Sequence, residues 1–254
     1  MNRYFIEVSY HGKGFSGFQI QDESITIQGE VNKAFETILK KKIETTTSSR
    51  TDAGVHALQN FLHLDIEDTL PSSIIYNLNA LLPIGISVNN IFPVHPKSHA
   101  RFDALGRRYS YQIIPVKQPF RHDRAYFYPF AVNKILLEET AQMLLQVEDF
   151  TSFSKKKTDV KTFLCKLSES HWEFYADGSY VYQVSGNRFL RGMVRALVGT
   201  QLQVARGRIT VQEFQSIIDS KDCTLADFSA RPEGLFLEEV QYPPGLLGRP
   251  LPRR

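Results

Sequence analysis

Cysteine is scarce in this chain of 254 residues, and its scarcity excludes two kinds of structure. The two cysteines, Cys165 and Cys223, stand far apart with no close-spaced partner. That spacing excludes a cysteine-based metal knuckle and provides no disulfide framework. The spacing of His95 and His99 is interrupted by Pro96, which breaks the helix that such a metal site requires. We therefore expect a reducing compartment and no bound metal.

Long hydrophobic runs are also missing. No window reaches about 18 consecutive apolar residues, the length that a membrane-spanning helix requires. The first ten residues alternate like a strand and carry Arg3 and Glu7 where a signal peptide needs an unbroken apolar run. These absences predict a cytoplasmic protein with no membrane partner.

Positive charge is only slightly in excess, since the formal net charge is +3. The composition, with 42% hydrophobic residues, is that of an ordinary globular protein. An excess this small does not by itself imply that the protein binds nucleic acid, so we examine how the basic residues are distributed along the chain. The basic residues form clusters: Arg101, Arg107 and Arg108; Arg121 and Arg124; Lys155–Lys157; Arg188, Arg191 and Arg195. Any one such cluster is commonly a solvated face.

The usual nucleotide-binding and serine-hydrolase motifs are absent as well, since neither a Walker sequence nor a Gly-x-Ser-x-Gly elbow occurs. Gly12 to Gly17 does match the Gly-x-Gly-x-x-Gly fingerprint, but the apolar stripe of the next helix begins only at Ile27. That helix cannot present its N-terminus to a pyrophosphate held by the glycines. We therefore expect no nicotinamide or flavin cofactor, and we interpret the segment as a flexible glycine loop near a substrate.

Strand-like and helix-like segments alternate along the chain in two similar series. The first series contains a strand at 3–10, a helix at 27–39 and a strand at 61–66, with a further helix-like stretch at 72–82. The second series contains a strand at 107–114, a helix from Asn133, a hairpin at 172–185, a long helix that includes Phe189 to Val198, a helix opened by the capping box Thr210-x-x-Glu213, and a strand at 235–240.

This order predicts an α+β fold built from two similar α/β halves. The halves are expected at residues 1–100 and 101–245. A tail rich in proline, glycine and arginine follows at residues 246–254.

The segment Ser49–His56 places one carboxylate, that of Asp52, on a glycine-containing turn between two strand-like segments. An Arg-x-Asp sequence is commonly no more than a surface ion pair, here of Arg50 and Asp52. The position of Asp52 at a strand edge nevertheless makes it the candidate reactive carboxylate.

Two further segments combine arginine with aromatic or apolar residues. In a strand, Arg107, Tyr109 and Tyr111 share one face, which suits a base stacked beside a phosphate; a partly buried tyrosine pair is an equally good interpretation. In the long helix, Arg188, Arg191 and Arg195 recur at steps of three and four and lie on one stripe beside the apolar face. That stripe suits phosphates, or one arginine turned onto a carboxylate, or a solvated face.

Taken together, these segments resemble the tRNA pseudouridine synthase A family over nearly the whole chain. Four segments carry the resemblance, of which the second is the most specific: Tyr10–Gly12 with Gly17–Gln19, Arg50–His56, His99–Phe102 with Arg107–Tyr111, and Phe189–Arg195 with Glu233–Leu237. The chain departs from the family pattern at His11, Phe18 and Ser49, where family members commonly have Asp, Trp and Gly. These departures bear on local loop shape rather than on the activity.

The resemblance implies the pseudouridine synthase fold, in which two halves with antiparallel sheets meet at a central basic cleft. It also implies isomerisation of uridine to pseudouridine in the anticodon stem-loop of tRNA, typically at positions 38 to 40, by a homodimer without a cofactor. A stem-loop is recognised mainly by shape and backbone, which explains why scattered basic clusters suffice.

By the same resemblance, Asp52 is the catalytic carboxylate, and whether it attacks C1′ or drives glycal formation stays open. Tyr109 matches the tyrosine that stacks on the flipped base and is a candidate acceptor of the C5 proton. Arg195 matches the arginine that pairs with the carboxylate and keeps it ionised.

The substrate-binding residues implied are Arg50, which fills the space left by the extruded nucleotide, Tyr109, and Leu235, which walls the uracil pocket. Arg107 and Arg191 are further candidates for contact with the RNA. Two alternatives remain: a catalytically silent protein that binds structured RNA, and a hydrolase that uses Asp52 and a water molecule to release the base.

Overall fold

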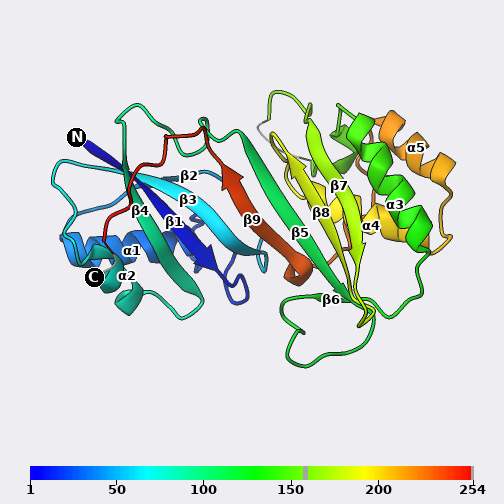
Figure 1. Ribbon diagram of the computed structural model, residues 1–254, viewed down its shortest axis with the longest axis horizontal. Helices are drawn as coiled ribbons and strands as arrows, with labels where there is room; N and C mark the ends of the chain where they lie inside the picture. The colour runs from blue at the N-terminus through cyan, green and yellow to red at the C-terminus, as the bar shows by residue number, and fades with distance from the viewer. Residues whose placement is uncertain (157–159, 253–254) are drawn as a thin grey trace. The chain divides into compact units, whose positions relative to one another are not determined.

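The computed structural model describes residues 1–156 and 160–252 (Figure 1). Lys157 of the predicted lysine cluster, and Arg253 and Arg254 of the predicted tail, lie outside the described residues. The chain divides into two compact units. Unit 1 comprises Met1–Leu105 with Leu237–Arg254, and unit 2 comprises Gly106–Phe236.

The sheet of unit 1 is built around β1 (Asn2–Tyr10), which pairs antiparallel with β3 (His56–Ile66) and β4 (Ile86–Val94). The short strand β2 (Thr45–Thr47) pairs antiparallel with β3. Phe5 and Ile6 of β1 are fully buried. Two helices, α1 (Ile27–Leu39) and α2 (Ile74–Leu81), pack against each other, and α2 packs against β4 (Figure 1).

Unit 2 contributes an antiparallel part of the sheet, in which β8 (Tyr180–Gly186) lies between β5 (Gly106–Ile114) and β7 (Leu167–Phe174). The two-residue strand β6 (Tyr126–Phe127) runs parallel to β5. Three helices accompany this sheet, and α3 packs against both α4 and β7 (Figure 1). The helices are α3 (Lys134–Met143), α4 (Met193–Ala205) and α5 (Val211–Ser220), with short 3₁₀ turns at Leu144–Gln146, Thr151–Phe153 and Pro232–Gly234.

The last strand, β9 (Leu235–Gln241), begins at the end of unit 2 and continues into unit 1. The sequence pattern places this strand in the second half, whereas the structure places the residues from Leu237 on in unit 1. Hydrogen bonds explain the difference, because Leu105 N donates to Gln241 O (2.8 Å) and Leu251 N donates to Ile91 O (2.8 Å). The first division between the two units falls between Leu105 and Gly106.

The fold class predicted from the sequence is confirmed, since each unit combines helices with antiparallel strand pairs. The predicted helix at 27–39 coincides with α1. Over the described residues, none of the helices has the length and apolar character that crossing a membrane requires.

Candidate functional site

Asp52 lies on the tight turn that follows β2 and leads into β3. The turn is closed by Val55 N, which donates to Asp52 O (3.1 Å), and Gly54 has a φ of +79°, which glycine adopts at little cost. Asp52 is half-buried and Ala53 is exposed. The predicted glycine-containing turn between two strands is therefore present, with its carboxylate near the protein surface.

The glycine loop of residues 12–17 lies directly against this turn. A Cβ on Gly12 would lie 2.1 Å from Val55 O, and a Cβ on Gly17 would lie 2.9 Å from Thr51 O. The next residue, Phe18, donates its N–H to Thr51 O (3.1 Å). The glycines match a dinucleotide fingerprint, but two of them, Gly12 and Gly17, lie against the backbone of the Asp52 turn.

The three departures from the family pattern all lie around the same turn. Phe18 is fully buried, with its ring centroid 5.5 Å from that of Tyr10. The ring of His11 is 4.4 Å from that of His56, and Ser49 is buried. Each substituted side chain is thus accommodated in the local packing.

Sequence reasoning missed the residues that support this turn. Tyr10 Oη lies 2.9 Å from Thr51 Oγ1, and Asn60 Nδ2 donates to Ser49 O (3.0 Å). The buried His56 accepts a hydrogen bond at Nδ1 from Gly12 N (3.0 Å). Tyr10 and His56 stand at the ends of two of the motif segments, which was the only signal available for them.

Arg107 and Tyr109 lie on β5 in unit 2. Tyr109 is buried, with 8% of its surface exposed, and its ring packs edge-on against Phe189 at 4.9 Å. Arg107 is half-buried, and its Nη1 donates to Asn187 O (3.4 Å). Tyr111 is fully buried, and its hydroxyl donates to Arg231 O (2.7 Å).

Burial also raises the pKa of Tyr111 well above its ordinary value, so its hydroxyl stays protonated. Of the two tyrosines on this strand, Tyr111 therefore fits the interpretation of a core residue. Tyr109 is also buried, with 8% of its surface exposed.

Arg195 lies on α4 and is half-buried, and its Nε donates to Ala230 O (2.6 Å). The single long helix predicted from Phe189 onward is wrong at its start, because Gly192 has a left-handed φ of +75° and α4 begins at Met193. The exposed Arg191 therefore precedes the helix and does not share a helical stripe with Arg195. Leu235 is buried at the beginning of β9.

The structure thus brings Arg50 and Asp52 together on one turn of unit 1, with Arg50 exposed. The other predicted residues belong to unit 2; these are Arg107, Tyr109, Arg191, Arg195 and Leu235. Within the described parts of the chain, no group of three or more His, Cys, Asp or Glu side chains is arranged to hold a metal ion.

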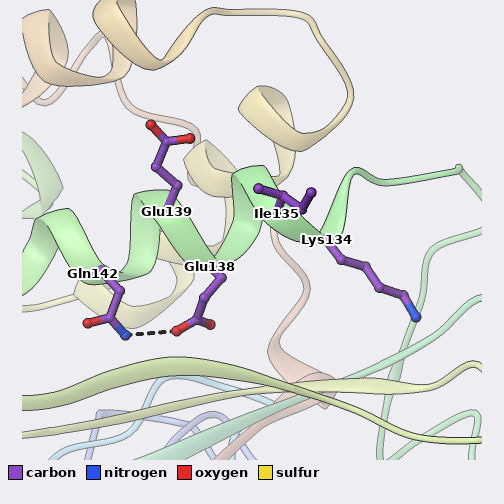
Figure 2. Close-up of a pocket in the computed structure, with 5 residues that line it drawn as sticks. All are labelled: Lys134, Ile135, Glu138, Glu139 and Gln142. Atoms are coloured by element: carbon purple, nitrogen blue, oxygen red, sulfur yellow. Dashed lines mark hydrogen bonds between the residues drawn. The ribbon is translucent and has the colours of Figure 1, made fainter.

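A surface pocket lies elsewhere, on α3 of unit 2 (Figure 2). It is lined by Lys134, Ile135, Glu138, Glu139 and Gln142. Gln142 Nε2 donates to Glu138 Oε1 (2.7 Å), as the dashed line in Figure 2 marks. All the lining residues come from one helix and none is a predicted site residue, so this pocket is not the candidate site.

Comparison with known proteins gives a consistent result. A family model described as tRNA pseudouridine synthase matches residues 140–243. A tRNA pseudouridine synthase A from Parabacteroides distasonis is 41% identical over 245 residues, which cover 96% of this chain and 97% of the relative. One from Bacteroides thetaiotaomicron is 42% identical, covering 96% and 91%. One from Staphylococcus aureus strain MRSA252 is 36% identical, covering 94% and 91%.

Proposed function

This chain belongs to the tRNA pseudouridine synthase A family, and on that premise we propose that Asp52 is the carboxylate through which it isomerises uridine to pseudouridine. The proposed target is the anticodon stem-loop of tRNA, at positions 38 to 40. The observation that supports Asp52 most directly is its place on a turn whose backbone is held by the glycine loop, with the carboxylate half-buried near the surface.

The reaction rearranges bonds without a net gain or loss of atoms. The C1′–N1 bond breaks, the uracil turns in place, and C5 bonds to C1′, while C5 loses a proton and N1 gains one. A carboxylate can serve either by attacking C1′ or by removing a proton from the sugar on the way to a glycal. In both routes Asp52 has to be ionised and aimed at the ribose, which a rigid turn favours.

We assign the remaining residues the roles that the resemblance implies. Tyr109 stacks on the flipped uracil, and its ring is already held in place by Phe189. Arg195 stabilises the ionised catalytic carboxylate, and Arg50, exposed on the same turn as Asp52, occupies the space left by the extruded nucleotide.

Leu235 forms a wall of the uracil pocket, and Arg107 and Arg191 contact the RNA backbone in this proposal. Arg191 is exposed, as a phosphate contact requires, and Arg107 is half-buried. We further propose that the protein acts as a homodimer in the cytoplasm, as the family resemblance implies.

The first test is to incubate the purified protein with unmodified tRNA transcripts and to map pseudouridine by carbodiimide treatment and primer extension. We expect stops confined to positions 38 to 40. Asp52→Asn should lower the rate by about 100- to 10,000-fold, the scale of losing a catalytic acid or base. Because the substitution preserves shape, tRNA affinity should change by no more than a few fold.

The controls separate the alternatives. A transcript with cytidine at positions 38 to 40 should give no stops. Tight binding by the wild-type protein without any modified uridine would favour a silent RNA-binding protein, and strand scission by amine at the target would indicate a hydrolase. Full activity of Asp52→Asn would remove Asp52 from the catalytic role.

A further inference from the structure

Three polar side chains form a buried network directly behind the Asp52 turn. Tyr10 at the end of β1, Thr51 on the turn and Asn60 on β3 have 5%, 9% and 0% of their surface exposed. Tyr10 Oη lies 2.9 Å from Thr51 Oγ1, and Asn60 Nδ2 donates to Tyr10 Oη at 3.3 Å. Buried polar groups cost free energy unless they are hydrogen-bonded, so this network is held by its own bonds.

Asn60 has a fixed orientation in this network. Its Oδ1 accepts a hydrogen bond from Phe61 N (2.9 Å), which fixes the orientation of the amide and turns Nδ2 toward Tyr10 and Ser49 O. Tyr10 Oη accepts from Asn60 and also lies within hydrogen-bond distance of Thr51 Oγ1, where either hydroxyl can donate. The hydroxyl of Thr51, the residue before Asp52, is thus linked through Tyr10 to the oriented amide of Asn60.

The network sets which side chains of the turn face inward. Ser49 and Thr51 are buried, and each is hydrogen-bonded to the network, through Ser49 O and Thr51 Oγ1. Arg50, which lies between them, is exposed, and Asp52 is half-buried. The two anchored residues thus alternate along the chain with the two functional candidates, Arg50 and Asp52. A one-residue slip of this segment would reverse that arrangement.

A local irregularity of the sheet brings Tyr10 to this place. In the pairing of β1 with β3, Val8 is opposite Asn60 but Tyr10 is opposite Ala57, so β3 carries one extra residue between these pairs. A bulge of this kind redirects side chains and commonly occurs beside active sites. It is a second observation, independent of the hydrogen bonds, that points to a positioning function.

We propose that Tyr10, Thr51 and Asn60 are positioning residues that hold the Asp52 carboxylate in the orientation the reaction requires. The inference rests on the proposed catalytic function of Asp52. Misplacing a reacting group by about 1 Å can cost about a hundredfold in rate, so a network that touches no substrate can still control the chemical step.

The test measures single-turnover rate, tRNA affinity and thermal unfolding in matched variants. Thr51→Val removes the hydroxyl at nearly constant shape, Thr51→Ser retains it, and Tyr10→Phe removes its partner. We expect Thr51→Val and Tyr10→Phe to lower the single-turnover rate about 10- to 100-fold with affinity unchanged within a few fold. Thr51→Ser should restore most of the rate.

Tyr182→Phe is the control for a merely structural effect. Tyr182 is fully buried in unit 2 and its hydroxyl lies 2.8 Å from Ser170 Oγ, so the variant loses a comparable buried hydrogen bond away from Asp52. We expect it to lower the unfolding temperature but to leave the single-turnover rate unchanged, when assayed well below that temperature.

The double variant of Tyr10→Phe with Thr51→Val should lose no more rate than the more impaired single variant, because both remove the same bond. Wild-type rates in Thr51→Val and Tyr10→Phe, with Asp52→Asn inactive, would overturn the positioning function and leave the proposed activity intact. An equal rate loss in Tyr182→Phe would overturn it as well. An active Asp52→Asn would instead refute the catalytic assignment on which the inference rests.

Discussion

At the scale of single residues, two glycines with similar backbone angles have different surroundings. Gly14 and Gly17 have φ values of +87° and +93°, which side-chain-bearing residues adopt at a cost of about 1 to 2 kcal/mol. A Cβ on Gly14 would meet nothing within 4 Å, whereas one on Gly17 would meet Thr51 O at 2.9 Å. Gly17 therefore carries a steric requirement that Gly14 does not.

We predict that Gly17→Ala lowers the free energy of unfolding more than Gly14→Ala, by about 1 kcal/mol or more, because it adds a backbone clash to the same strain. It should also slow pseudouridine formation, since the clash displaces the residue before Asp52. Urea unfolding of both variants measures the first effect, and single-turnover assays the second. An equal decrease in the free energy of unfolding in the two variants would contradict the prediction, because it would show that the turn moves away from residue 17 without cost.

The sequence was sufficient to place Asp52 on a turn, because Gly54 and the flanking strand patterns are local signals. It did not reveal that Tyr10 and Asn60 hold that turn. These residues come from strands that meet only in the folded sheet, and the bulge that aligns them is a property of the pairing rather than of either strand.

At the scale of helices and strands, local chemistry predicted the side-chain caps of two helices, α3 and α5. Asn133 caps α3 by accepting hydrogen bonds from Ile135 N and Leu136 N, and the capping box of α5 is present. The start of α4 was missed because the apolar spacing of Phe189 and Leu190 continues that of the helix. Only the left-handed φ of Gly192 interrupts it, and periodicity does not encode a backbone angle.

The α5 capping box gives a direct stability prediction. Thr210 Oγ1 accepts from Glu213 N (3.1 Å), and Glu213 Oε2 accepts from Thr210 N (2.7 Å). Thr210→Ala should lower the free energy of unfolding by about 1 kcal/mol, and Thr210→Ser should lower it far less because serine caps equally well. Denaturant titration checks both; an unchanged midpoint for the alanine variant would mean that α5 does not depend on its cap.

At the scale of the whole molecule, acid stability should depend on His63. This residue is buried and accepts a hydrogen bond at Nδ1 from Ala100 N (3.2 Å). Burial, with further contributions from Arg3 and His99, lowers the pKa of His63 from 6.5 to about 4. Between these pH values the unfolded chain binds a proton that the folded protein does not, so the stability of the fold falls as pH decreases.

We predict that the free energy of unfolding decreases by up to about 3 kcal/mol between pH 6.5 and pH 4 on account of His63 alone. His63→Gln, which retains an acceptor for Ala100 N but does not titrate, should show a correspondingly weaker dependence. The pKa of His99 is also lowered, so His99 likewise makes the free energy of unfolding fall as pH decreases, both in the wild-type protein and in the variant. Identical slopes for the two proteins in urea titrations across this range would refute the prediction.

The division into two units was predictable only in part. The two alternating series indicated two halves, but a strand does not reveal its partner, and residues from Leu237 on belong to the unit that contains the N-terminus. Tyr242 illustrates what the sequence could not show. Its ring lies 5.4 Å from that of Phe5 and 5.1 Å from that of Phe61, and its hydroxyl donates to Ala100 O.

This discontinuity has a consequence for the order of events during synthesis on the ribosome. Unit 2 is a continuous stretch of chain and has all of its residues once Phe236 has emerged, whereas unit 1 lacks part of its core until the segment that contains Tyr242 has followed. Domains fold as units during translation, usually from the N-terminus onward. Here the part of the enzyme translated first, which bears the Asp52 turn, is the last to be completed, so a prematurely terminated chain contains the carboxylate but not the finished support beneath it.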